Sequence, residues 1–172
     1  MIVANAKNLA DRAGLLRLHG SSAEYTHTIV GTNSRLDTLQ AAVLLVKLTH
    51  LNQWTVNRQR HASIYDESLD GLAGLTLPYG DSRCVHVYNQ YTIRTPKRDA
   101  LQQFLSEKGI GTRVYYPTPL HLQRSLAFLG YKEGDFPESE RAAREVVSIP
   151  VYPEMTADQQ AYIVRCVHEF YR

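Results

Sequence analysis

The sequence predicts an α/β fold in which one long helix accompanies a small, mainly antiparallel sheet faced by helices. Three patterns carry this prediction. From Ser34 to about Leu69, apolar residues recur at intervals of three and four, which is typical of a helix. Between Cys84 and Thr95, apolar and polar residues alternate as in a strand. Thr156 and Gln159 stand at the spacing of a capping box, which marks the start of a last helix.

The other elements follow from the same periodicities and from proline and glycine positions. Met1 to Ala4 reads as the end of an apolar strand, and a helix follows from Ala6 to Leu18 with Asn5 in the cap position. The later predicted elements are a helix at 97–108, strands at 112–116 and 147–151, a short helix at 122–129, a helix at 137–146 and a last helix ending at 171. This order places helices against a small sheet.

The composition excludes several classes of protein. A length of 172 residues suits one domain, or one domain with an appended piece. The net charge of +2 is small and the basic residues are dispersed, so we expect no nucleic acid and no membrane as partner. Cys84 and Cys166 match no metal or redox motif, and no secretory signal opens the chain. These features predict a cytoplasmic protein.

The segment from Gly31 to Ala42, with the sequence GTNSRLDTLQAA, is the most informative part of the chain. Ser34 and Asp37 have capping-box spacing, which predicts that the long helix begins here. Unpaired amides before a helix attract anions, and Asn33 and Arg35 add side-chain donors. By pattern alone, an ordinary capped helix and an anion-binding loop are the two alternatives.

A second notable segment is RVYYPTPLH, from Arg113 to His121. A predicted strand delivers Tyr115 and Tyr116 to an exit that prolines stiffen, and His121 follows. Tyrosine and histidine there offer flat faces and hydrogen-bonding tips, which suit a sugar or a base. The alternative is a tyrosine pair in the core beside a surface histidine.

Other kinds of site find little support. The seven histidines show no paired spacing typical of a metal site, so no metal ligand is predicted. No serine lies in a Gly-x-Ser-x-Gly turn, and no glycine-rich phosphate loop is present in the sequence. A metal-dependent hydrolase is therefore the weakest of the functional hypotheses.

Four segments together resemble a known family. They occur in the order Gly31–Ala42, Val87–Arg94, Tyr115–His121 and Pro150–Glu154. Over essentially all 172 residues, the chain resembles the C-terminal half of the DegT/DnrJ/EryC1/StrS family of pyridoxal-phosphate-dependent sugar aminotransferases. The resemblance implies the aspartate-aminotransferase-type fold I and a homodimer whose active sites use both subunits. It also implies transfer of an amino group, usually from glutamate, to a nucleotide-linked keto-sugar during amino-sugar biosynthesis.

The resemblance also implies roles for particular residues. Asn33 matches the asparagine that reaches the cofactor phosphate of the neighbouring subunit, and Arg35 beside it is expected to contact that phosphate or the substrate. Tyr115, Tyr116 and His121 fall in the segment that lines the nucleotide-sugar site. The form of this segment favours a 3-keto hexose, while the particular sugar and nucleotide stay open.

The chain departs from the family in its catalytic groups. In the family the aspartate at the pyridine nitrogen, the aromatic ring over the cofactor and a phosphate-binding turn all precede the matched region. The family's Schiff-base lysine precedes the matched region, and none of the five lysines matches its position: they are Lys7, Lys47, Lys97, Lys108 and Lys132. No catalytic residue is therefore assigned, and we expect this chain alone to be inactive and to bind no pyridoxal phosphate.

The missing lysine also suggests how the chain is organised. We expect a truncated piece of a longer enzyme, in which residues 1–33 are a remnant of the large cofactor domain. Residues 34–172 would be the connecting helix and the C-terminal small domain. This organisation predicts exposed apolar surface on the first helix and the early long helix, where the large domain would pack. The alternative is a non-catalytic nucleotide-sugar-binding or dimerisation module.

Overall fold

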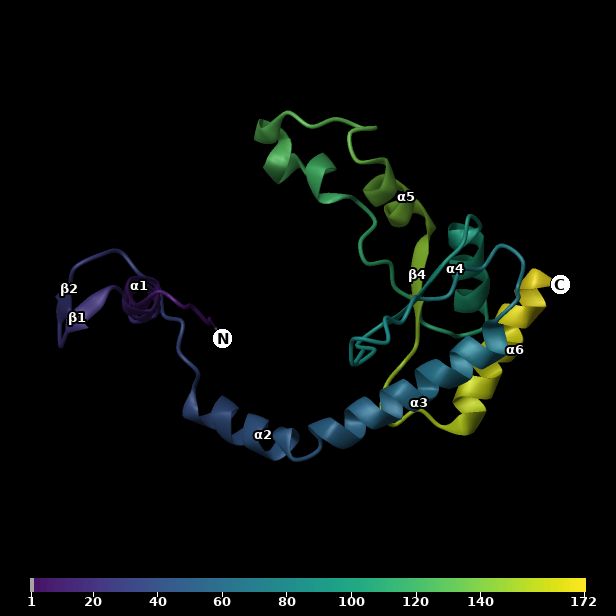
Figure 1. The fold of residues 1–172 in the computed structure, drawn as a ribbon, viewed down its shortest axis with the longest axis horizontal. Coiled ribbons are helices and arrows are strands. Elements are labelled where there is room, and N and C mark those ends of the chain that lie inside the picture. Colours follow the sequence, from purple (N-terminus) through teal and green to yellow (C-terminus); the bar gives the residue numbers. More distant parts are fainter. Residues whose placement is uncertain (1) are drawn as a thin grey trace. The chain divides into compact units, whose positions relative to one another are not determined.

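A computed structural model describes residues 2–172 and divides the chain into two compact units (Figure 1). One unit extends to His50 and the other runs from Leu51 to Arg172. This division falls inside the long helix that the sequence predicts. The assignment of residues 1–33 to a large domain stays a prediction.

The first unit consists of two helices and a small hairpin. Helix α1 (Lys7–Arg17) confirms the first predicted helix, although Ala6 rather than Asn5 is its N-cap and no side chain caps it. Strands β1 (Ser21–Ala23) and β2 (Thr26–His27) form an antiparallel hairpin that the polar sequence did not suggest. The predicted strand at 1–4 is wrong for residues 2–4, which form no strand. Met1 lies outside the described residues.

The predicted long helix is two helices, α2 (Thr38–Leu48) and α3 (Leu51–Leu69). The interruption lies at Thr49 and His50. The backbone amide and the hydroxyl of Thr49 both donate to the Val46 carbonyl, at 3.3 and 2.8 Å, which forms a tight turn in place of the regular helical bond. The apolar periodicity hid this break because it continues in register on both sides.

The capping box predicted at Ser34 and Asp37 is also absent. Asp37 is the N-cap of α2 in extended conformation, but its side chain makes no capping bond. The hydroxyl of Ser34 lies 3.0 Å from that of Thr32 and so engages its own loop. A capping-box spacing therefore did not suffice here to form the box.

The apolar side chains of the first unit are largely exposed. No residue of α1 or α2 is buried, although α2 is rich in leucine and valine. Leu39 and Leu45, for example, expose 78% and 66% of their surface. The predicted apolar surface on these two helices is therefore confirmed. No helix within residues 2–172 combines the length and apolar character needed to cross a membrane.

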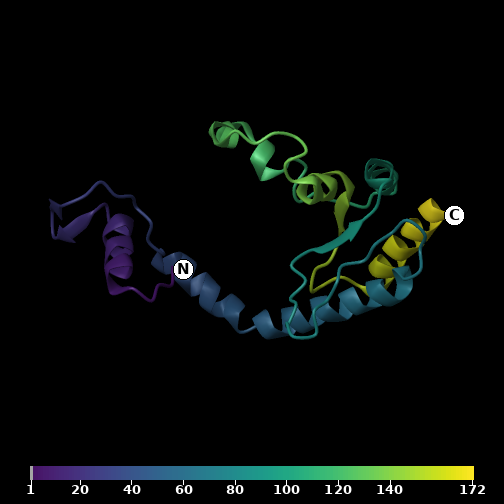
Figure 2. The ribbon, with the colours of Figure 1, turned by 45° about the horizontal axis from the view of Figure 1, so that its top comes forward.

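The second unit holds the core. Strand β3 (Tyr91–Arg94) pairs antiparallel with β4 (Val146–Ile149), so that Tyr91 faces Ile149 and Arg94 faces Val146. Helices α3, α4 (Arg98–Glu107) and α6 (Ala157–Tyr171) surround this pair, and Figures 1 and 2 both show α3 and α6 side by side. The fully buried side chains include Tyr65, Tyr91, Ile93, Leu101, Leu105, Val147 and Val167.

Two core tyrosines keep their hydroxyl groups satisfied. Tyr65 donates to the carbonyl of Pro150 at 2.9 Å, and Tyr91 donates to a carboxylate oxygen of Asp66 at 2.5 Å. Burial raises the pKa of both phenols, so both remain protonated donors. These bonds join α3 to the strand pair and to the chain that follows β4.

The predicted fold class is confirmed, but regular strands are shorter than expected. The strand predicted at 84–95 is regular only at 91–94, because Tyr88 has a positive φ of 45° that interrupts extended pairing. The strand at 112–116 is reduced to one bridge between Arg113 and Ser148. Prolines at 117 and 119 remove the amides that further pairing would need.

The segment after these prolines is less helical than predicted. The helix expected at 122–129 is replaced by two short 3₁₀ segments, η1 (Leu120–Leu122) and η2 (Arg124–Leu129). The second ends at Gly130, which is left-handed. Helix α5 (Pro137–Glu145) begins at the predicted proline.

The second predicted capping box is confirmed and gives a test of stability. The Thr156 hydroxyl accepts from the Gln159 amide at 3.2 Å, while the Gln159 side chain accepts from the Thr156 amide at 2.9 Å. We expect Thr156→Ala to lower the free energy of unfolding by about 1 kcal/mol, because a helix loses its cap. Ser106→Ala, at an exposed position of α4, is the control and should not destabilise. Equal urea midpoints for the two variants would contradict this expectation.

Candidate functional site

The loop that carries Asn33 is fastened to the end of α1. The amide of Thr32 donates to the Leu16 carbonyl at 2.8 Å, and the amide of Ser34 donates to the Arg17 carbonyl at 3.0 Å. The His19 amide donates in turn to the Thr32 carbonyl at 3.0 Å. The predicted supply of unpaired amides is therefore wrong for Thr32 and Ser34, which satisfy carbonyls at the helix end instead.

Two glycines permit this close approach. A Cβ on Gly31 would lie 2.3 Å from the amide nitrogen of Gly20 and 2.7 Å from the Leu16 carbonyl oxygen. Gly20 has a φ of +72°, and a Cβ there would meet the Ile29 carbonyl oxygen at 1.7 Å. Both positions exclude any side chain. The glycines flank the β1–β2 hairpin, and that placement is the signal that sequence analysis missed.

Side chains supply the donors that remain in this loop. The Arg35 Nε donates to the Asn33 Oδ1 at 3.1 Å, which turns the amide nitrogen of Asn33 away from the arginine. Both residues are exposed, and the hydroxyl groups of Thr32 and Ser34 lie beside them. A guanidinium, an amide nitrogen and two hydroxyls suit a phosphate group, which accepts several charge-assisted bonds. The structure thus brings Asn33 and Arg35 together.

The second group of predicted residues lies in the other unit. Tyr115, Tyr116 and Leu120 form one wall of a hollow of about 400 Å³, and Ala142 and Ala143 of α5 line it from the other side. The tyrosine rings meet edge to face with centroids 5.8 Å apart. They expose 41% and 74% of their surface, so a buried core pair is excluded. Of the rim expected from the sequence, the two tyrosines therefore line this hollow.

His121 has a different environment from the two tyrosines. It is 9% exposed and does not line the hollow. Its Nε2 donates to the Glu140 Oε1 at 2.9 Å, and its ring packs against Phe136 with centroids 4.8 Å apart. The structure therefore gives His121 a buried partner, and its role toward substrate stays a prediction.

Glu140 was not anticipated from the sequence. It is 5% exposed, and its Oε1 also accepts from the amides of Gly134 at 2.8 Å and Phe136 at 3.4 Å. Burial by itself would raise the pKa of this carboxyl, but the bonds from Gly134, His121 and Phe136 outweigh it and lower that pKa. In the sequence, Glu140 looks like any acidic residue in the first turn of a helix.

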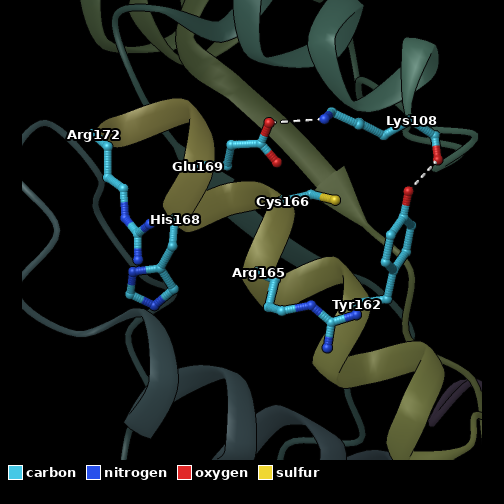
Figure 3. Close-up of a pocket in the computed structure, with 7 residues that line it drawn as sticks. All are labelled: Lys108, Tyr162, Arg165, Cys166, His168, Glu169 and Arg172. Carbon is cyan, nitrogen blue, oxygen red and sulfur yellow. Dashed lines mark hydrogen bonds and ion pairs between the residues drawn. The ribbon is translucent and has the colours of Figure 1, made fainter.

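A second hollow lies beside α6 and contains one of the lysines (Figure 3). It measures about 530 Å³, and Figure 3 shows the Lys108 side chain reaching across to Glu169. The Lys108 Nζ lies 2.8 Å from the Glu169 Oε1, and this bond raises the pKa of the ammonium group. A lysine that attacks a carbonyl needs a neutral amine and hence a lowered pKa. Lys108 therefore lacks the environment of a Schiff-base lysine.

Potential metal ligands are dispersed within residues 2–172. No group of three or more histidine, cysteine or carboxylate side chains in that range could hold a metal ion.

Comparison with known proteins identifies the class to which the chain belongs, a family of aminotransferases. The chain belongs to the DegT/DnrJ/EryC1/StrS aminotransferase family, whose profile matches residues 1–168. Similar proteins include a "pleiotropic regulatory protein" of Geobacillus stearothermophilus, which is 51% identical over all of this chain and 47% of its own length.

Two further relatives have names that state a reaction. The dTDP-3-amino-3,4,6-trideoxy-alpha-D-glucose transaminase of Streptomyces venezuelae is 38% identical over 98% of this chain and 45% of its own length. The UDP-N-acetyl-3-dehydro-alpha-D-glucosamine 3-aminotransferase of Acidithiobacillus ferrooxidans is 36% identical over 97% and 44%, respectively. The chain thus spans about half the length of the curated relatives it matches.

A solved structure confirms the aminotransferase fold. The crystal structure of S. venezuelae DesV, in complex with a ketimine intermediate, matches with a TM-score of 0.91 and 38% sequence identity. The match covers 99% of this chain and 46% of the DesV chain.

The close approach of the two glycines gives a testable prediction. Gly31→Ala should speed exchange of the Thr32 and Ser34 amide protons, because the added methyl group forces the loop away from α1. Gly14→Ala is the matched control, since a Cβ on Gly14 meets nothing within 4 Å and favours the helix. Hydrogen exchange followed by NMR measures both variants. Unchanged exchange in Gly31→Ala would contradict the steric account.

Proposed function

We propose that these 172 residues serve as the C-terminal part of a pyridoxal-phosphate-dependent aminotransferase. The proposed substrate is a nucleotide-linked 3-keto-sugar, and the amino donor is glutamate, as the family resemblance implies. The observation that carries the proposal is the pairing of Asn33 with Arg35 on an exposed loop, within a chain that belongs to this family. The product would be an amino sugar for a cell-surface polysaccharide or a glycosylated metabolite.

In this proposal, Asn33 and Arg35 bind the cofactor phosphate of the neighbouring subunit in a homodimer. When bound, pyridoxal phosphate supplies the electron sink that makes amino transfer feasible. The two side chains fit the phosphate because they are exposed, and because the Arg35–Asn33 bond leaves the amide nitrogen of Asn33 directed away from the arginine. They bind and orient the group but transfer no proton in this scheme.

Tyr115 and Tyr116 are the proposed contacts for the nucleotide-sugar. Their exposed rings stand at the edge of a hollow large enough for a sugar ring or a base. His121 belongs to the same segment but is only 9% exposed, so it is not counted among these proposed contacts.

The names of two relatives support the choice of carbon 3. One relative is named for a dTDP-linked 3-amino sugar and the other for a UDP-linked 3-dehydro sugar. Because the two named nucleotides differ while position 3 is shared, we propose position 3 and leave the nucleotide open.

The apolar surface of α2 supports the proposed place of this chain in a larger enzyme. Leu36, Leu39, Val43 and Leu44 line a hollow of about 450 Å³ that is almost wholly apolar. We propose that the large cofactor domain, to which residues 1–33 would belong, packs on this surface. Cys84 and Cys166 are unpaired thiols, which supports a cytoplasmic location.

A non-catalytic nucleotide-sugar-binding or dimerisation module is the second candidate. The ion pairs of Lys108 with Glu169 and of Lys7 with Asp11 favour this candidate, because an ion-paired lysine is poorly suited to form a Schiff base. A preceding segment with the family lysine in the same gene would exclude this candidate.

The proposed phosphate contact predicts the effect of one substitution. In the full-length protein, Asn33→Ala should weaken pyridoxal phosphate binding about tenfold or more, because a hydrogen bond to a charged group is lost. Asn8→Ala, at an exposed position of α1, is the control. Cofactor titration by absorbance measures both dissociation constants. Equal affinity of Asn33→Ala and the unmodified protein would argue against the contact.

The proposed inactivity of the isolated chain has its own test. After incubation of residues 1–172 with pyridoxal phosphate and borohydride, peptide mass mapping should find no lysine modified stoichiometrically. The reason is that none of the five lysines matches the family position, and the pKa of Lys108 is raised by its bond to Glu169. One full adduct at a single lysine would refute the inactive assignment.

A further inference from the structure

Glu140 connects the two walls of the hollow beside Tyr115. One wall comes from the chain at Tyr115 to Gln123, and the other comes from α5, including Ser139 and Ala142. Neither His121 nor Glu140 lines the hollow itself. His121 lies in η1 and Glu140 in α5, and each of these elements contributes other residues to one wall. The bond between His121 Nε2 and Glu140 Oε1, at 2.9 Å, therefore joins the walls from behind.

The surroundings of this bond are closed to water. The side chains of His121 and Glu140 expose only 7% and 6% of their surface. The Phe136 ring covers the imidazole, and Tyr131 packs edge to face on Phe136 with centroids 5.1 Å apart. A buried carboxylate is stable only when its oxygens are well satisfied, and here one oxygen accepts from a side chain and two backbone amides.

Regular secondary structure does little to fix the segment with the tyrosines. A backbone bridge between Arg113 and Ser148 precedes this segment. From Tyr115 to Leu122 the chain contains two prolines and a short 3₁₀ turn, so few backbone bonds determine its distance from α5. A buried charge-assisted bond is stronger than a neutral one and directional. It is therefore suited to hold this segment in place.

We propose that Glu140 is a positioning residue that, through His121, holds the Tyr115–Leu122 segment against α5 and so sets the shape of the hollow. His121 then acts behind the wall and does not contact the ligand. The inference rests on the proposed function only for the identity of what the hollow binds. The connection between the two walls stands on the geometry of this chain.

The test compares Glu140→Gln and His121→Gln, singly and combined, in the 172-residue chain. Glu138→Gln is the matched control, because Glu138 lies in the same turn of α5 but is exposed and paired with Arg141. The measurements are amide exchange at Gly134 and the NMR signals of the Tyr115 and Tyr116 rings. Exchange at Ile93, in the core strand β3, reports whether each variant is folded.

We expect Glu140→Gln to raise exchange at Gly134 about tenfold, since a neutral acceptor replaces a charged one. The ring signals of both tyrosines should shift alike in the two single variants. The double variant should shift them no further, because both substitutions remove the same charge-assisted bond. Ring signals unchanged in both single variants, or additive shifts in the double variant, would overturn the proposal.

Kinetics of the full-length protein separate this inference from the proposed function. If both hold, Glu140→Gln raises KM for the nucleotide-sugar while kcat stays nearly constant, and Glu138→Gln changes neither. Shifted tyrosine signals with an unchanged KM would uphold the positioning role and refute the assignment of the hollow to the sugar. A fall in kcat alone would contradict the positioning role.

Discussion

The contact between Gly20 and Gly31 is the constraint on which the candidate cofactor loop depends. Without side chains at these positions, the loop can lie against the last turn of α1 and satisfy the carbonyls of Leu16 and Arg17. Because the amides of Thr32 and Ser34 already donate to these carbonyls, they cannot donate to an anion. The loop therefore presents side-chain donors, with Asn33 and Arg35 held together by their own hydrogen bond. A tight backbone approach thus decides which groups of the loop remain available.

In the second unit, side-chain hydrogen bonds rather than a close backbone approach hold the chain in place. Its core is built on the β3–β4 pair and on helices α3, α4 and α6, and its tyrosine hydroxyls are satisfied by Asp66 and Pro150. The tyrosines near the hollow stand outside this core, on a segment with few backbone bonds. There a buried carboxylate, Glu140, replaces regular hydrogen bonding as the element that fixes the chain.

Sequence alone predicted most of the helices, and it missed the contacts that place the candidate site residues. The Thr156 capping box was predicted correctly because the last helix begins where the spacing places it, whereas the box at Ser34 is absent because α2 begins only at Thr38. The break at Thr49 depends on a side-chain bond that apolar periodicity does not encode. The bond of Glu140 to His121 spans 19 positions of the sequence, so no local pattern reveals it.

The central claim is that Asn33 serves the active site of the neighbouring subunit. Mixing two full-length variants tests it most directly, at a pyridoxal phosphate concentration too low to saturate a weakened site: one variant carries Asn33→Ala, and the other has the family's Schiff-base lysine replaced. In a hybrid dimer, one site would then receive an intact lysine and an intact Asn33 from different subunits. The account predicts recovery of about a quarter of the unmodified activity after random exchange of subunits in a twofold dimer. No activity above that of the separate variants would contradict it.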